Sequence, residues 1–125
     1  MQTEKKAVTD LIEAITLGMQ AKKAQDIRLL NLQHVDGAVA KYFILCSGRA
    51  KSQVEAIAEA VIEVSYQHTA QRPWQQEGWT AKEWILIDYV DVVVHIFHVD
   101  KRSFYALDTL WGDASADSIT DSAFD

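Results

Sequence analysis

The sequence is poor in cysteine, proline and glycine, with one Cys, one Pro and five Gly in 125 residues. The single cysteine, Cys46, cannot form an internal disulfide, so we expect a reducing, cytoplasmic setting. No apolar run is long enough to cross a membrane, and the first residues lack an apolar signal core, so we expect no membrane contact. A hydrophobic content of 49% argues against an intrinsically disordered chain.

Basic residues are also scarce, because 12 Lys and Arg face 18 Asp and Glu, which gives a net charge of −6. Binding to nucleic acid over a wide area needs clustered Lys and Arg, and this balance therefore predicts little direct nucleic-acid contact. A negatively charged domain is attracted instead to a basic surface. If the chain works near RNA, we expect a basic protein to be its contact there.

The first half of the chain alternates between helical and strand-like patterns. Apolar residues at three- and four-residue spacing predict an amphipathic helix over residues 4–21, with Gly18 as a weak stop signal near its end. Strands are predicted over residues 26–35 and 41–46, and Asp36-Gly37 between them indicates a hairpin whose connection exceeds two residues. A second helix is predicted over residues 51–71, with Ser47 or Ser52 as its cap and Pro73 beyond its end.

The second half contains a short exposed strand or loop at residues 73–79, two tightly joined strands at 83–89 and 91–99, and a short helix within 101–114. This order predicts one α/β (α+β) domain, in which helices flank a mixed sheet of four or five strands. We place the domain at residues 1–112. Residues 113–125 contain four aspartates and no base, and we expect a disordered acidic tail there.

Four polar residues interrupt the most apolar segment, residues 84–100: Asp88, Asp91, His95 and His98. Strand alternation places His95 on the same face as Asp91 and His98 on the opposite face. The two histidines therefore cannot bind one metal ion from a straight strand, and the few other Cys and His residues make a zinc site improbable. We predict no metal site.

Asp88 and Asp91 lie where one predicted strand ends and the next begins. Each aspartate alone is explained by turn chemistry, because its side chain bonds nearby backbone groups. Together they have two functional interpretations. They could hold Mg²⁺ for nucleotidyl or phosphoryl transfer, or they could accept hydrogen bonds from Lys or Arg of a partner.

The enzyme alternative lacks its usual companions in this sequence. The segment "CSGRAKS", residues 46–52, precedes a helix but has one glycine and no G-x-x-x-x-G-K pattern. Cys46 ends an apolar strand and has no obvious base, so we predict no catalytic residue and no cofactor. Several tryptophans and Tyr89 gather near the predicted sheet edge, which favours a protein interface.

The same region resembles a known family. "EGW" followed by "WILIDYVDVVVHIFHVDKRSFYALDTLWGDA" is similar to the ribosomal silencing factor family, also called the Iojap family. The similarity covers about residues 11–114 and includes Asp88-Tyr89-Val90-Asp91. One residue departs from the pattern, because the family usually has glycine where this chain has Val90. A bend that needs a positive φ would be strained by valine.

The resemblance implies a fold related to nucleotidyltransferases without their activity. It also implies binding to the large ribosomal subunit through the fourteenth large-subunit ribosomal protein, and a homodimer when the chain is free. On this basis we predict a steric factor that blocks joining of the small subunit and represses translation when nutrients are scarce. We predict that Trp84, Leu86 and Tyr89 provide its apolar contacts and that Asp88 and Asp91 pair with basic residues of the partner. His95 has an interior and an interface role open to it, and a module that only dimerises remains a third alternative.

Overall fold

The computed structural model describes residues 2–101 and 115–119. The chain begins with helix α1 (Gln2–Ala21), followed by strands β1 (Gln25–Asn31) and β2 (Tyr42–Gly48) and helix α2 (Lys51–Thr69). Strands β3 (Gln75–Glu77), β4 (Trp84–Asp88), β5 (Val92–His98) and β6 (Ser115–Ile119) complete it. The predicted helix within residues 101–114 falls almost entirely outside the described residues, apart from a helical turn at 99–101.

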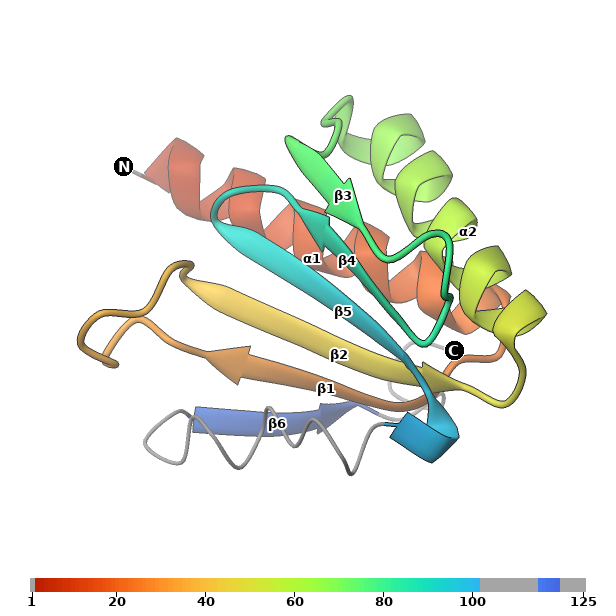
Figure 1. Ribbon diagram of the computed structural model, residues 1–125. Coiled ribbons are helices and arrows are strands. Elements are labelled where there is room, and N and C mark those ends of the chain that lie inside the picture. The colour runs from red at the N-terminus through yellow and green to blue at the C-terminus, as the bar shows by residue number, and fades with distance from the viewer. Residues whose placement is uncertain (1, 102–114, 120–125) are drawn as a thin grey trace.

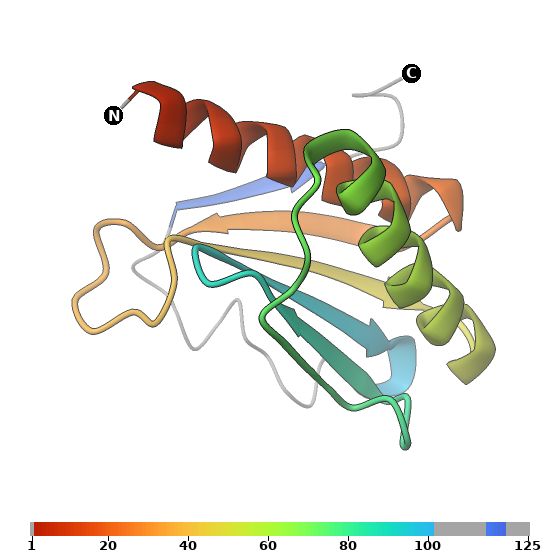
Figure 2. The same cartoon turned by 90° about the horizontal axis from the view of Figure 1, so that it is seen from above.

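The strands form one mixed sheet in the order β3-β4-β5-β2-β1-β6. Among the described strands, β2 and β5 form the one parallel pair, because α2 carries the chain back across the sheet between them. Both helices pack against one face of the sheet (Figures 1 and 2). The predicted class, one α+β domain with a mixed sheet and flanking helices, is confirmed.

Strand β6 adds a sixth strand beyond the four or five predicted, and it pairs antiparallel with β1. It lies within the segment expected to be a disordered tail, and its sequence, "SADSI", has too little apolar content to indicate a strand. The remainder of that segment lies outside the described residues, and the domain boundary at residue 112 stays a prediction.

Alternation along the strands gives the sheet an apolar surface on both faces. On the helix side, Ile85, Ile87, Val94 and Ile96 pack with the buried faces of α1 and α2. On the other side, a second core contains Leu30, Leu32, Phe43, Leu45, Val93 and Phe97, and Trp84 and Leu86 pack against it. The odd-numbered residues of β5 therefore belong to the second core, as the strand pattern predicted.

The first helix ends at Ala21, as predicted, and Gly18 lies within its last turn. A Cβ at Gly18 would lie 2.9 Å from the Ala60 carbonyl oxygen and 2.9 Å from the Val61 Cα. Glycine is therefore present because α1 crosses the backbone of α2 at close range.

We expect Gly18→Ala to destabilise the protein by about 1–2 kcal/mol. Overpacking against backbone costs roughly 1–3 kcal/mol, and the better helix propensity of alanine returns at most about 1 kcal/mol. Guanidinium unfolding measures the change, with Glu13→Ala on the exposed face of α1 as the control expected to stay within about 0.5 kcal/mol of the parent. An unchanged or higher midpoint for Gly18→Ala would show that the helices do not cross so closely.

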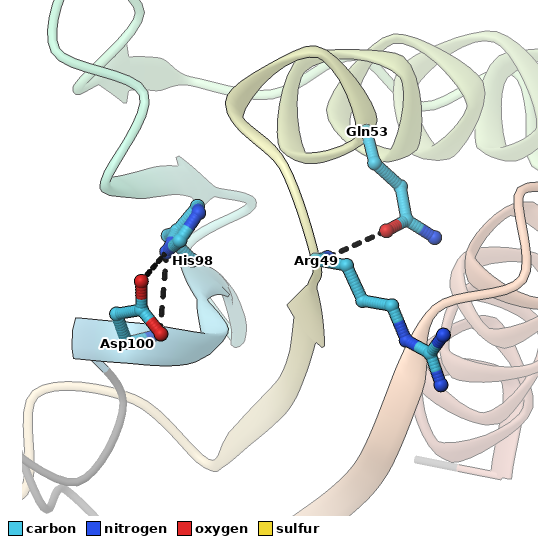
Figure 3. Close-up of polar contacts among 4 residues, drawn as sticks. All are labelled: Arg49, Gln53, His98 and Asp100. Carbon is cyan, nitrogen blue, oxygen red and sulfur yellow. Dashed lines mark hydrogen bonds and ion pairs between the residues drawn. The ribbon is translucent and has the colours of Figure 1, made fainter.

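The start of α2 is also arranged differently from the prediction. Neither Ser47 nor Ser52 caps it, since the N-cap residue is Ala50 and makes no side-chain cap hydrogen bond. Instead, the backbone N–H of Arg49 donates to the Gln53 side-chain oxygen at 2.6 Å (Figure 3). The Gln53 amide nitrogen donates in turn to the carbonyl oxygens of Lys22 and Lys23, so one glutamine joins the end of α1 to the start of α2.

The far end of β5 carries the second polar contact in Figure 3. The backbone N–H of Asp100 donates to His98 Nδ1 at 3.2 Å, and the Asp100 carboxylate lies 3.6 Å from the same nitrogen. A nitrogen that accepts a hydrogen bond carries no proton, so we interpret the carboxylate contact as proximity rather than an ion pair. His98 is half-buried and on the face opposite His95, as alternation predicted.

Candidate functional site at the bend between β4 and β5

The loop at residues 32–41, the start of α1 and the connection from β4 to β5 lie together at one end of the sheet (Figures 1 and 2). The connection is a tight hairpin turn, as predicted, because the Tyr89 N–H donates to the Val92 carbonyl oxygen at 2.9 Å. Only Val90 and Asp91 lie between these two residues. We call residues 88–92 the bend.

Asp88 has one role inside the bend. Its Oδ1 accepts a hydrogen bond from the Val90 N–H at 2.7 Å, which is the turn chemistry expected of an aspartate. The side chain is half-buried, and its other oxygen has no hydrogen bond or ion pair with any described residue. Asp88 therefore shapes the turn and still presents negative charge at the surface.

Asp91 uses its backbone and leaves its carboxylate free for a partner. Its carbonyl oxygen accepts hydrogen bonds from the N–H groups of Lys41 and Tyr42, at 2.9 and 3.0 Å. Within residues 2–101 and 115–119, its carboxylate has no hydrogen bond and no ion pair. The backbone bonds fix the bend to β2, so the free carboxylate sits on a well-supported corner.

Trp84 and Leu86 lie on the same face of β4 as Asp88, away from the helices, and both are half-buried. The Trp84 ring stacks on Phe97 with centroids 5.3 Å apart. We give the name acidic bend surface to this face of β4 together with Asp91 of the adjoining bend; along it, Asp88 lies next to the bend and Trp84 at the other end of the strand. It combines apolar area with two carboxylates, which is the chemistry expected of a contact for a basic protein.

Tyr89, which was predicted to contact the partner, is only 7% exposed. Its hydroxyl shares a 2.7 Å hydrogen bond with Ser65 of α2. Burial raises the pKa of Tyr89 above its ordinary value of 10.0, while the hydrogen bond with Ser65 acts weakly in the opposite direction. The residue anchors the bend to the helix layer, so its contribution to a contact is to support the surface from within.

His95 has an interior role, which the sequence left open. It is 3% exposed, and its Nδ1 accepts a hydrogen bond from the Trp84 indole N–H at 3.0 Å. The Phe43 ring meets it edge-on at 4.6 Å. This geometry places the proton on Nε2, which is buried and has no hydrogen-bond partner among the described residues. His95 thus orients the Trp84 ring from the interior through this hydrogen bond.

Burial lowers the pKa of His95 from 6.5 to about 3, so the ring stays neutral in the folded protein. The unfolded chain takes up a proton near pH 6.5 and the folded chain does not, so stability is complete above pH 6.5 and falls below it. The expected slope is about 1.4 kcal/mol per pH unit, or roughly 2 kcal/mol lost between pH 6.5 and 5. Urea unfolding at a series of pH values measures it.

A matched variant isolates this effect. His95→Asn keeps an acceptor near the Trp84 indole N–H and removes the titrating ring, so its stability should depend less on pH over this range. If both proteins lost stability at the same rate between pH 6.5 and 5, His95 would not be the buried titrating group.

Val90 has φ +78 and is 59% exposed. The Asp91 N–H also donates to the Tyr89 carbonyl oxygen at 3.1 Å across it. A positive φ at the first of two central hairpin residues favours glycine, and a β-branched residue there is strained. The strain expected from the sequence is therefore present in the bend.

We expect Val90→Gly to stabilise the fold by about 1 kcal/mol. Relief of a strained dihedral returns roughly 1–3 kcal/mol, and the greater freedom of glycine in the unfolded chain takes back about 0.5–1 kcal/mol. Thermal unfolding should show a Tm higher by about 3–5 °C. Val39→Gly, at an exposed valine without a positive φ, is the control and should give no gain. A lower Tm for Val90→Gly would contradict the strain.

Two exposed apolar residues near the bend were not predicted as site residues. Val39 is 79% exposed in the 32–41 loop. Trp74 is 70% exposed, and its backbone N–H donates to the Asp88 carbonyl oxygen at 2.7 Å. Trp74 belonged to the aromatic group that indicated an interface, whereas nothing in the loop sequence marked Val39, because an irregular loop has no periodicity from which exposure can be inferred.

The described residues offer little for the enzyme alternative. Among residues 2–101 and 115–119, no group of three or more His, Cys, Asp or Glu side chains is arranged to hold a metal ion. Asp88 is engaged with the turn, so the bend matches a contact surface better than a paired-carboxylate metal site.

Among the residues that the structure describes, no helix is long and apolar enough to cross a membrane.

Comparison with known proteins identifies the family of the chain. The model of the family described as "Ribosomal silencing factor during starvation" matches residues 4–124. The chain is 42% identical over 93 residues to the ribosomal silencing factor of Bacillus subtilis, covering 74% of this chain and 77% of that protein. It is 36% identical over 105 residues to that of Halalkalibacterium halodurans, covering 84% and 88%.

A solved structure shows the same fold. The crystal structure of a Chromobacterium violaceum protein superposes with a TM-score of 0.77 at 27% identity, covering 83% of this chain and 85% of that one. The family consists of ribosome-binding factors rather than enzymes, which decides against the transferase alternative. The chain belongs to the ribosomal silencing factor family.

Proposed function

We propose that the chain silences the large ribosomal subunit by docking its acidic bend surface on a basic ribosomal protein and standing in the path of the small subunit. The observation that supports this best is that Asp88 and Asp91 form no ion pair with any described base, and that Asp88 continues the face of β4 that carries the half-buried Trp84 and Leu86. Such a surface is incomplete without a cationic partner. The partner we propose is the fourteenth large-subunit ribosomal protein.

The four residues would contribute in two ways. Trp84 and Leu86 would provide the apolar centre, where buried area and water exclusion strengthen binding. Asp88 and Asp91 would fix the orientation by charge-assisted hydrogen bonds to Lys or Arg, because such bonds are about twice as strong as neutral ones. The net charge of −6 favours encounter with a basic protein and disfavours direct contact with ribosomal RNA.

The proposed mechanism is steric and needs no chemistry at the bend. A folded domain bound to the face of the large subunit that meets the small subunit would prevent the two from joining. Translation then falls in proportion to the fraction of large subunits occupied. Because the target is the ribosome, we place this activity in the cytoplasm.

We also propose that the free chain is a homodimer, as the family resemblance implies. The exposed apolar residues at the bend end, Val39, Trp74 and Val90, are the surface that a second copy would cover. Multi-angle light scattering should then give twice the monomer mass of 14.1 kDa at micromolar concentration. A mass of one chain at all concentrations would contradict the dimer and leave docking untouched.

Co-sedimentation tests the docking itself. Purified chain is mixed in separate tubes with large subunits, with small subunits and with the isolated fourteenth large-subunit ribosomal protein. We expect saturable binding to the large subunit and to the isolated protein, and none to the small subunit. Binding to large subunits that lack this ribosomal protein, at undiminished affinity, would contradict the proposed partner.

A further inference from the structure

The strained position of Val90 calls for a reason beyond the turn. Glycine satisfies φ +78 at no steric cost, and a β-branched side chain there is an outlier. Packing does not explain the valine, since its side chain is 59% exposed. Strained residues that persist without internal contacts occur mostly at functional sites.

The Val90 side chain borders a shallow, open hollow of about 420 Å³ between the bend and the 32–41 loop. Apolar residues of the loop line the same hollow, among them Leu32, Val35, Ala38 and Val39. Val39 is 79% exposed on its rim. Two exposed valines thus line one hollow from two segments that lie some fifty residues apart in the sequence.

The charges at the hollow indicate what it would receive. Asp36 and Asp91 line it, and within the described residues neither carboxylate has an ion pair or a hydrogen bond. Lys41 is the single base among the lining residues. A hollow lined by apolar side chains and two free carboxylates suits an apolar side chain that has a Lys or Arg beside it.

We propose that this hollow is a second contact site for the ribosomal partner, and that Val90 and Val39 hold an apolar side chain of that partner next to a basic one. The inference rests on the proposed function and extends its contact from the face of β4 to the loop side of the bend. Val90 is then a contact residue that is retained at a cost in stability.

Opposite changes in stability and binding test this inference. Val90→Gly should raise the Tm and yet weaken binding to cognate large subunits by about fivefold to tenfold, because the apolar side chain buried on binding is lost. Val39→Ala should weaken binding by about threefold. Val99→Ala, at an exposed valine beyond the other end of β5, is the matched control and should bind like the parent chain.

Fluorescence anisotropy of labelled chain with purified large subunits gives the dissociation constants. Parent-like binding by both Val90→Gly and Val39→Ala would overturn the second contact while the proposed docking stands. An equal loss in Val99→Ala would also overturn it, since the effect would not be local to the hollow. If the parent chain did not bind large subunits, both the docking proposal and this inference would fall.

Discussion

Asp88→Lys should weaken binding to the large subunit by roughly 30-fold or more. Removal of one partner of a desolvated charge pair costs about 2–5 kcal/mol, and the lysine adds repulsion against a basic surface. The substitution reverses the charge at the centre of the acidic bend surface, and no nearby described base is released to compensate. Pelleting with large subunits measures the change.

A second substitution separates the charge of Asp88 from its place in the turn. The Asp88 carboxylate accepts the Val90 N–H, so the lysine variant also loses a turn hydrogen bond. Asp88→Asn retains an oxygen for that bond and removes only the charge. We expect it to weaken binding by roughly tenfold while its stability stays close to that of the parent.

Asp100→Lys is the matched control for net charge. Its carboxylate is exposed beyond the opposite end of β5, and the substitution changes the total charge by the same amount. It should bind almost as the parent does. Equal losses in Asp88→Lys and Asp100→Lys would mean that long-range attraction, rather than contact at the bend, governs binding.

Trp84→Ala should destabilise the fold by about 3 kcal/mol. The ring stacks on Phe97 and its N–H satisfies His95 Nδ1, so truncation removes packing and leaves a buried acceptor without its donor. Loss of a tryptophan from a core costs roughly 3–5 kcal/mol, and partial exposure places this site at the lower end. Urea unfolding at pH 7.5 measures the loss.

Trp84→Phe distinguishes the two contributions. Phenylalanine keeps most of the stacking area on Phe97 and lacks only the N–H donor, so its cost should be about 1 kcal/mol. A loss below 1 kcal/mol for Trp84→Ala would show that the indole is not held by the second core. A full 3 kcal/mol loss for Trp84→Phe would assign nearly all of the energy to the single hydrogen bond with His95.

Much of the fold could be predicted because the central strands are apolar and their side chains alternate between two faces of the sheet. The alternation in residues 92–98 separates Val94 and Ile96 from Val93 and Phe97, and the structure places them in different cores. The end of the first helix was predicted correctly, but the role of Gly18 at the close crossing with α2 was not, because the sequence does not show which helices touch. The cap of α2 was missed because Gln53 reaches back from inside the helix.

The candidate site, like the fold, could be predicted from the sequence only in part. Sequence reasoning located Asp88 and Asp91 at a tight bend, since two strand patterns meet there. It could not separate Tyr89, which points to Ser65 in the helix layer, from the half-buried Trp84 and Leu86. That distinction depends on which face a bend residue turns to, and alternation does not extend through a turn. The exposure of Val39 is likewise a property of the packed loop.

Subunit joining tests the central claim most directly. Large and small subunits are mixed at a magnesium concentration that favours joining, with increasing amounts of the chain, and light scattering reports the joined fraction. We predict that the parent chain lowers this fraction to near zero at saturation, that Asp100→Lys does the same, and that Asp88→Lys leaves joining intact at equal concentration. Inhibition of joining by Asp88→Lys as strong as that by the parent chain would contradict the account.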